Sequence, residues 1–526
     1  MYILLIFQTS CYIAFLNRLM TDVPALIKEA GTRTDFQAER EQDHQHPLEI
    51  SDKSQAGTSL IWNQRKLLRK IEILKKKLLK QKNEVKAAKR IIKKSHGRHF
   101  TNKDKLLALS IFKKSPKAYN FLRKLFTLPS KRTLQDILKL ITIRPGLNPA
   151  IFDKIKDTAS KLGREDKLCQ IMFDEMSVSP SLHFDTGLDE ICGFEDFGEA
   201  NRNNNIADHV ILFIIKGIKA QYKQPVCFAF CKSATKAVIL KNLLKKIIEE
   251  LFAAGLIVIS TVCDQSTINN KVINDLLEET KANYYRKGEE ARELAFEIAN
   301  KKIYPLFDPP HLLKGIRNNL ITKDLHYIQD GKKKIAKWDH LKLLLNIDSG
   351  EDDLRMCNKL TEAHVLPEKI PKMKVKHAAQ VFSQRVSSAL RFCAKHKLLP
   401  DECADTADVL LLFDHLFDSF NGSSYKKSHK TYKSCLKTNS EHFMLWDKAL
   451  PILRSMQFKR ETKKRDGSVV LHYEQVPSIK NWIHNINSMK HLWNNKIETQ
   501  YILYTDAQLQ SGSSGKLFFM CKKPWG

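Results

Sequence analysis

The hydrophobic pattern of the chain contains two short apolar runs that each carry an aspartate at or near their end. Cys169 to Met176 reads CQIMFDEM, and Leu256 to Asp264 reads LIVISTVCD. Apolar runs of this length, rich in β-branched residues and bounded by polar or turn residues, predict buried strands. We therefore expect two strands that bring the carboxylates of Asp174 and Asp264 to one end of a sheet.

Carboxylates placed in this way suit phosphoryl transfer on DNA. Two Mg²⁺ ions about 3.5–4 Å apart, held by hard oxygen ligands, activate the attacking oxygen and stabilise the leaving oxygen. A second interpretation stays open on the pattern alone, because a single aspartate at a strand end is often a helix cap or a turn residue.

A pattern with a period of seven residues begins at Leu60. Two interleaved sets of positions repeat at this period: Leu60, Leu67, Leu74, Gln81 and Ala88, and Ile71, Leu78, Val85 and Ile92. This alternation is typical of a coiled coil, so residues 60–95 are predicted to pair the chain with a second copy. The segment is strongly basic, which indicates either a DNA phosphate between the paired helices or a solvated lysine-rich face. Residues 1–58 are predicted to be disordered or uncertain, and the apolar first 16 are too short to span a bilayer.

Residues 98–158 show helix-start signals at short intervals. Ser115 before Pro116 predicts one helix, and Pro129 before Ser130 predicts another. Three short helices, the last of which begins with Lys131 and Arg132, resemble a helix-turn-helix whose third helix enters a major groove. An ordinary helical subdomain with exposed lysines fits the same pattern.

Charge narrows the choice of partner. Lys and Arg exceed Asp and Glu by 88 to 58, a formal net charge of +30. This excess favours a polyanion, double-stranded DNA or another nucleic acid first and an anionic membrane second. The 11 cysteines occur without a CxxC pair or a Cys/His knuckle, so we predict reduced thiols in a cytosolic or nuclear protein, and no zinc site.

Six segments together resemble the P-element transposase family, including its THAP-domain relatives, and they occur in one order along the chain. The segments are ALSIFKKSPKAYNFLRKLFTLPSKRTL (108–134), IMFDEMSV (171–178), TVCDQSTIN (261–269), FDPPHLLKGIRNNL (307–320), KMKVKHAAQVFS (372–383) and LFDHLFDSFNG (412–422). The resemblance implies a DNA transposase of α/β fold, with an RNase H-like catalytic core interrupted by a large all-α insertion. The core would span residues 160–319 and 488–526, and the GTP-binding insertion residues 320–487.

The resemblance also implies a set of site residues. The first two metal-binding acids of the family fall on Asp174 and Asp264, with Mg²⁺ as the ion if the chain is active. Four further positions match the family's D-x-x-HL-x-K-x-x-RN segment, which suits the start of a helix beside a DNA backbone. We interpret these positions, His311, Lys314, Arg317 and Asn318, as supporting or DNA-proximal residues rather than metal ligands.

The insertion is expected to bind GTP without a GxxxxGK[ST] loop, which the sequence lacks. Similarity to the family places the nucleotide contacts on Lys374, Val375, Asp418 and Asn421. An aspartate can accept hydrogen bonds from guanine, and a lysine suits phosphate; alternatively, Asp418 and Asn421 form a helix end and a turn. Helices are expected over residues 338–345, 373–395 and 405–420.

The sequence departs from the family at two places. No Cys/Cys/Cys/His spacing of a THAP zinc finger occurs before residue 60. In the stretch 509–518, which matches the family's final acidic helix, Gly512 and Gly515 stand where acids belong. Losing a carboxylate from a two-metal site removes a ligand, and glycine weakens the helix by about 1 kcal/mol relative to alanine.

These observations predict a nuclear, transposase-derived protein that binds DNA, GTP and a second copy of itself and is catalytically impaired. The alternative is an active, GTP-dependent cut-and-paste transposase that uses two-metal DNA cleavage and strand transfer. A membrane-attached basic protein is a third and weaker interpretation, and no membrane partner is predicted.

Overall fold

The structure is a computed structural model that describes residues 100–139, 143–185, 189–198, 201–220, 222–349, 355–421, 431–434, 436–437, 439–463 and 469–498. The regions predicted as an uncertain N-terminus and a coiled coil, and the segment 509–518, lie outside these residues. The chain divides into two compact units, one up to Ile143 and one from Arg144 onward. Each unit is described by itself.

The described part of the first unit contains α3 (Asn102–Lys114), α4 (Pro116–Leu125) and α5 (Lys131–Lys139). The predicted helix starts are confirmed by side-chain caps. The hydroxyl of Ser115 accepts from the backbone N–H of Ala118, and the hydroxyl of Ser130 accepts from the backbone N–H of Thr133. The hydroxyl of Tyr119 donates to the carbonyl oxygen of Pro129 at 2.7 Å and fixes the turn before α5. A small core holds the three helices together: Ala108, Leu109, Tyr119, Leu134 and Leu138.

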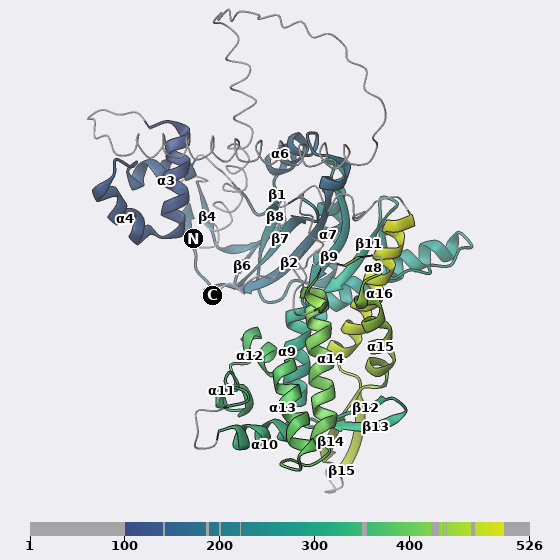
Figure 1. Ribbon diagram of the computed structural model, residues 1–526. Helices are drawn as coiled ribbons and strands as arrows, with labels where there is room; N and C mark the ends of the chain where they lie inside the picture. Colours follow the sequence, from purple (N-terminus) through teal and green to yellow (C-terminus); the bar gives the residue numbers. More distant parts are fainter. Residues whose placement is uncertain are drawn as a thin grey trace, which may run out of the picture. The chain divides into compact units, whose positions relative to one another are not determined.

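The second unit is built on a large mixed sheet, shown in Figure 1. In the described residues its strands follow the order β10 (Phe296–Ile298), β11 (Lys301–Phe307), β9 (Ile257–Cys263), β2 (Leu168–Ser177), β7 (His209–Gly217), β8 (Lys223–Cys231), β5 (Phe194–Asp196) and β6 (Arg202–Ile206), and β1 (Gly146–Leu147) pairs with β8. Strands β2, β7 and β8 are antiparallel, whereas β9 and β11 continue the sheet in parallel from β2. This is the arrangement expected of an RNase H-like core.

Helices cover the sheet because parallel strands need crossover connections. Helix α7 (Ala237–Ala253) links β8 to β9, and α8 (Thr267–Arg286) links β9 to β10. Helix α6 (Pro149–Ala159), which precedes the short η1 (Arg164–Lys167), packs against α7 and contributes to the main hydrophobic core. The structure therefore groups α6 with the sheet, whereas the sequence analysis extended the helical DNA-binding region to residue 158.

The insertion follows α9 (Pro309–Leu320) and is mostly helical. Its described elements are β12 (Leu325–Gln329), β13 (Lys332–Ala336), α10 (Asp339–Asp348), α11 (Glu362–Val365), α12 (Val375–Val381), α13 (Gln384–Lys395), α14 (Cys403–Asn421), η2 (Thr431–Lys433), α15 (Glu441–Ser455), β14 (Gln457–Lys463) and β15 (Val469–Glu474). The region predicted as a single helix over residues 373–395 is two helices, because Ser383 is extended and its side chain caps α13.

The prediction that the insertion is entirely helical is wrong, because the insertion contains a four-stranded sheet in the order β13-β12-β14-β15 among the described residues. The turn between β12 and β13 is Asp330-Gly331, with φ of +51° and +73°. Asp-Gly is the sequence signature of a two-residue hairpin turn, since both positions must adopt positive φ. This signal was present in the sequence between two short strands.

The chain returns to the core through α16 (Pro477–Glu498), which packs against β11, α9 and α15. The buried side chain of Asn485 accepts from the backbone N–H of Phe307 at 2.7 Å and donates to the carbonyl oxygen of Phe307 at 2.7 Å. His484 contacts the carbonyl oxygen of Pro305 at 3.1 Å. Helix α16 therefore satisfies the outer edge of β11, and the predicted core boundary at 487/488 falls inside this helix.

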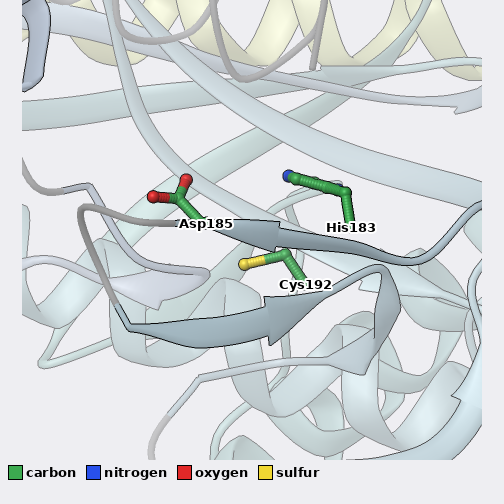
Figure 2. Close-up of side chains that lie close together, drawn as sticks. All are labelled: His183, Asp185 and Cys192. Atoms are coloured by element: carbon green, nitrogen blue, oxygen red, sulfur yellow. The ribbon is translucent and has the colours of Figure 1, made fainter.

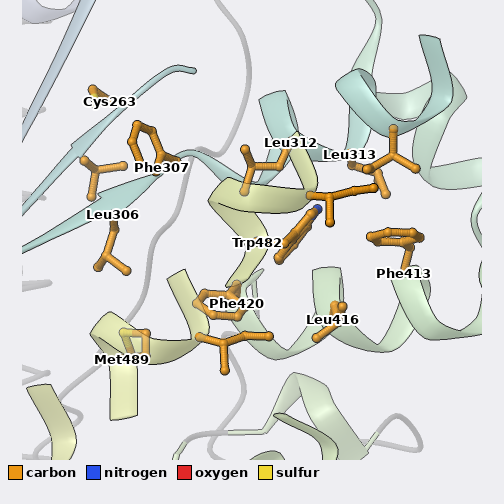
Figure 3. Close-up of a cluster of buried hydrophobic side chains, with 14 of the residues drawn as sticks. Cys263, Leu306, Phe307, Leu312, Leu313, Phe413, Leu416, Phe420, Trp482 and Met489 are labelled. Atoms are coloured by element: carbon orange, nitrogen blue, oxygen red, sulfur yellow. The ribbon is translucent and has the colours of Figure 1, made fainter. Parts of the chain in front are cut away.

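The core and the insertion share one hydrophobic cluster (Figure 3). Trp482 of α16 is fully buried, and its ring lies near Phe413 and Phe420 of α14, with centroids 6.3 and 5.6 Å apart. The close approach of α16 to α9 requires Gly315, since a Cβ there would lie 2.0 Å from Oγ of Ser478. In the described part of the chain, the helices lack the length and apolar character needed to cross a membrane.

We predict that Asn485→Asp destabilises the full chain by about 2 kcal/mol or more. The aspartate keeps the size of the side chain but cannot donate to the carbonyl of Phe307, which leaves a buried acceptor facing a carboxylate. The measurement is the thermal midpoint together with hydrogen exchange over residues 303–308. Asn494→Asp, an exposed position on the same helix, is the matched control. Equal midpoints for the two variants would contradict the docking role.

Candidate active site

The two predicted aspartates lie at neighbouring strand ends. Strands β2 and β9 are adjacent and parallel, with Met172 opposite Val262. Two residues further along both strands, the same register sets Asp174 opposite Asp264. Because paired positions of neighbouring strands project to the same side of a sheet, the structure brings these two carboxylates together.

A β-bulge sets this alignment. The register of the two strands shifts between Cys169 and Gln170, where β9 carries one extra residue, Ile259. Without the bulge, Ile259 would pair with Gln170 and Asp174 would lie opposite Cys263, whose side chain is buried in the core. The bulge therefore places both carboxylates, rather than one carboxylate and one thiol, at the same edge.

Local hydrogen bonds orient each carboxylate through one oxygen. Oδ1 of Asp174 accepts from the backbone N–H of Glu175 at 2.9 Å. Oδ1 of Asp264 accepts from the backbone N–H of Ser266 at 3.0 Å and from Nδ2 of Asn269 at 2.6 Å. In the described residues, Oδ2 of both aspartates keeps its lone pairs for another ligand. A hard divalent cation such as Mg²⁺ or Mn²⁺ prefers such oxygens.

The protonation of Asp174 reflects its surroundings. Although its side chain reaches solvent, the surrounding protein atoms and then the negative charge of Asp264 raise the pKa of Asp174 from 3.8 to about 6, while His311 acts in the opposite direction. The ionised pair is therefore under mutual repulsion at neutral pH. A divalent cation between the carboxylates would relieve it.

A third carboxylate, which the sequence analysis did not select, lies at the start of α9. Asp308 is the N-cap residue, and its Oδ2 lies 2.6 Å from Nδ1 of His311. Burial lowers the pKa of His311, but the hydrogen bond and charge of Asp308 outweigh it and raise the pKa. The charge of Asp308 also acts on Asp174. Asp-Pro-Pro is a helix-start signal, and it could have marked this residue.

The predicted DNA-proximal residues on α9 have different surroundings. The side chain of His311 is partly exposed, and Lys314 is buried close to the carboxylates, which act on it electrostatically while burial lowers its pKa. Arg317 is completely buried. Its guanidinium donates to Oδ1 of Asn318, at 3.1 Å from Nε, and to the carbonyl oxygen of Lys372. Of the two predicted roles, the supporting one therefore fits Arg317, because its donors are used inside the protein.

Comparisons with known proteins match three parts of the chain. Residues 143–277 match the family described as TNP-like, RNase H N-terminal domain, and residues 310–435 match TNP-like, GTP-binding insertion domain. Residues 63–136 match Transposable element P transposase-like, HTH domain. The structure is similar to that of the Drosophila P element transposase strand transfer complex, with a TM-score of 0.61 and 26% identity over 81% of this chain and 88% of that one.

These matches all point to the P-element transposase family. It is 30% identical over 335 residues to Transposable element P transposase of Drosophila melanogaster, an alignment that covers 63% of this chain and 40% of that protein. It is 25% identical over 333 residues to DNA transposase THAP9 of Homo sapiens, covering 60% of this chain and 34% of that protein. The chain thus spans less than half the length of either relative.

Within the matched GTP-binding insertion domain, the predicted nucleotide residues fall into two segments. Lys374 is the exposed N-cap of α12, and Val375 is the first residue of that helix. Asp418 and Asn421 lie in the last turn of α14, where Asp418 is buried and its carboxylate lies 3.2 Å from Nζ of Lys433. Both helices contact α9. A guanine base at Asp418 would therefore compete with an ion pair.

In the matched HTH domain, the predicted DNA contacts are accessible. Lys131 and Arg132 are the first two residues of α5, and both are exposed. Their positions agree with a helix that presents its N-terminal end to DNA. The contacts themselves stay a prediction.

We predict that Asp174→Asn raises the thermal midpoint of the metal-free chain at pH 7.5. The folded-state pKa of about 6 lies above the ordinary 3.8, so the unaltered chain loses stability as pH rises through this window, whereas the amide does not titrate. The gain should vanish near pH 4. Thermal melts in chelator across this range are the measurement.

Asp153→Asn, an exposed acid on α6, is the control for the general effect of removing a negative charge. Addition of Mn²⁺ should stabilise the unaltered chain at pH 7.5 and the Asp153→Asn variant equally, but not Asp174→Asn, because ligands stabilise the state that binds them. Stabilisation of all three by Mn²⁺ would contradict a metal site at Asp174.

Proposed function

We propose that this chain is a transposase-derived protein that binds DNA and GTP and whose DNA cleavage and strand transfer are impaired. One observation carries the proposal. Asp174 and Asp264 face each other across adjacent strands of an RNase H-like sheet, while Gly515 occupies the sequence position at which the family resemblance places the third acid. Such a site retains two ligands of a two-metal centre and lacks one.

The residues present suit divalent metal ions but hold them incompletely. Oδ2 of Asp174 and Oδ2 of Asp264 would provide the metal ligands, because Oδ1 of each is already hydrogen-bonded. When bound, a metal pair activates the attacking oxygen and stabilises the leaving oxygen. Lys314 lies buried beside the carboxylates and balances part of their charge. His311, held by Asp308, orients toward the same cluster.

A second candidate function, an active GTP-dependent cut-and-paste transposase, is favoured by Asp308. This carboxylate acts electrostatically on Asp174, and only its Oδ2 is used by His311. Its Oδ1 could serve as an additional metal ligand in place of the acid missing at Gly515. The two candidate functions therefore differ in a measurable way, namely whether the unaltered chain joins DNA strands.

The nucleic-acid partner is proposed to be double-stranded DNA. Support comes from the net charge of +30, from exposed Lys131 and Arg132 on α5, and from a similar solved structure that is a strand transfer complex. The basic heptads of residues 60–95 support self-association on that DNA. A protein with these partners acts in the nucleus.

The nucleotide partner is proposed to be GTP. The supporting observation is that α12 and α14, which carry Lys374 and Asp418, both pack on α9, whose first turn holds the catalytic-site histidine. Lys374 would contact phosphate, and Asp418 would accept from the amino and imino groups of guanine once Lys433 has moved.

We predict that the unaltered chain gives background strand transfer on pre-cleaved transposon ends with Mg²⁺ or Mn²⁺ and GTP. Gly515→Glu, alone or with Gly512→Asp, should raise the rate by about 100-fold, the effect typical of one electrostatic group at an active site. The gel-based joining assay is the measurement. Asp174→Asn in the restored background should return the rate to background.

The opposite result would select the second candidate function. Activity in the unaltered chain that is lost in Asp174→Asn would overturn the impaired assignment. Asp308→Asn then tests whether that residue completes the site, because the amide keeps the N-cap hydrogen bond to His311 while removing the charge.

We predict that DNA binding depends steeply on salt and that Lys131→Ala/Arg132→Ala makes it less so. Each neutralised phosphate contributes about −0.9 to the slope of log affinity against log salt concentration, so losing two contacts should flatten the slope by about 1.8. Fluorescence anisotropy with a labelled duplex measures this. Lys117→Ala/Lys124→Ala removes the same charge from exposed positions of α4 and should change the slope less. Equal slopes for both pairs would contradict a DNA-contacting α5.

A further inference from the structure

A small hairpin separate from the large sheet brings three different ligand types to one face. Strands β3 (His183–Asp185) and β4 (Glu190–Cys192) pair antiparallel, with His183 opposite Cys192. Because side chains alternate along a strand, Asp185 shares the face of His183, whereas Phe184 and its partner Ile191 point to the other face. Figure 2 shows the histidine, the aspartate and the cysteine gathered on the hairpin.

The three side chains are close enough to share one ion. A ring nitrogen of His183, a carboxylate oxygen of Asp185 and the sulfur of Cys192 all lie within 4.8 Å of one another, and each residue is half-buried. We propose that this hairpin binds a zinc-type divalent cation through His183, Asp185 and Cys192, with water as the fourth ligand. This site is independent of the proposed transposase function.

The ligand set selects the metal. Zinc binds thiolate at about 2.3 Å and imidazole or carboxylate at about 2.0–2.2 Å, which places tetrahedral ligand atoms about 3.3–3.7 Å apart. Small side-chain rotations bring atoms that lie within 4.8 Å of one another to this spacing. Sulfur and nitrogen ligands favour zinc over magnesium, whereas the all-oxygen pair Asp174 and Asp264 favours magnesium or manganese. The two centres therefore prefer different ions.

The backbone at the base of the hairpin holds the ligands in place. Gly193 directly follows Cys192, has φ of +116°, and packs so closely on the carbonyl of Ser181 that a Cβ would lie 2.0 Å from that oxygen. This close contact and the positive φ exclude any residue other than glycine at position 193 and fix β4 against β3. Glu190, which lies opposite Asp185 on the same face, forms ion pairs with Arg144 at 3.2 Å and with Arg202 at 3.5 Å.

The proposed ion has a physical role in this hairpin. A two-stranded ribbon is marginally stable in water by itself, and the far face exposes Phe184 and Ile191 to 58% and 52%. A cation that links the two strands would replace the missing hydrophobic support. The sequence gives no CxxC or knuckle spacing because cross-strand register, rather than local spacing, brings His183 and Cys192 together.

The test is metal analysis of the full chain purified without chelator and then dialysed against one equivalent of Zn²⁺. We expect close to one tightly held zinc per chain, and its loss in Cys192→Ser and in His183→Ala. His396→Ala, an exposed histidine on the end of α13, should retain the ion. Replacement of zinc by Co²⁺ should give a thiolate charge-transfer absorption that disappears in Cys192→Ser.

A rescue variant separates metal loss from misfolding. Cys192→His should keep the zinc but lose the Co²⁺-thiolate absorption, because imidazole replaces sulfur in the same position. Chymotrypsin cleavage after Phe184 should increase on chelation of the unaltered chain and should not increase further in Cys192→Ser. Absence of bound zinc in the unaltered chain, or a thiolate absorption that survives in Cys192→Ser, would overturn the proposal.

Discussion

The hydrogen bonds between α16 and the outer edge of β11 are the constraint on which the candidate active site depends. The backbone N–H of Asp308 donates to the carbonyl oxygen of Cys263, the last residue of β9, at 2.8 Å. The N–H and the carbonyl of the preceding residue, Phe307, therefore face away from β9. Asn485 pairs with both groups, and His484, whose pKa burial lowers to about 4, contacts the carbonyl of Pro305. Because proline has no N–H, the only backbone group that needs a hydrogen-bond partner at this edge position is its carbonyl oxygen. Helix α16 thus completes the sheet where no strand continues it, and it fixes the point at which α9 begins.

Helix α9 carries that constraint from the carboxylates to the insertion. Its first turn holds Asp308 and His311 beside Asp174, and its last turns hold Arg317, which is bonded to the carbonyls of the segment before α12. Between them, the carbonyl of His311 accepts from Gln265, and Gln265 accepts from Ser478 of α16. The residue after Asp264 therefore contacts both helices. One short helix consequently connects the edge that carries the carboxylates, the returning helix and the insertion, and the buried Arg317 forms part of that connection.

The sequence predicted what is local. Apolar runs ending near Asp174 and Asp264 became adjacent strands, and the Ser115-Pro116 and Ser130 signals became helix starts, because caps and strand periodicity act over a few residues. The Asp330-Gly331 turn was equally local and was missed. What local pattern cannot contain is pairing between distant residues: the Ile259 bulge, the burial of Arg317, and the hydrogen bonds between Asn485 and Phe307 all depend on contacts across the chain. Asp308 was passed over because a helix cap and a site carboxylate look the same in sequence.

Electrostatics connect the stability of this site to its chemistry. Burial, then the negative charge of Asp264 and, more weakly, that of Asp308 raise the pKa of Asp174, so ionising this carboxylate beside the other two costs free energy. Lys314 and His311 offset part of that cost, and a divalent cation would offset more. A fourth carboxylate added to this edge would increase the repulsion in the metal-free chain while improving metal binding.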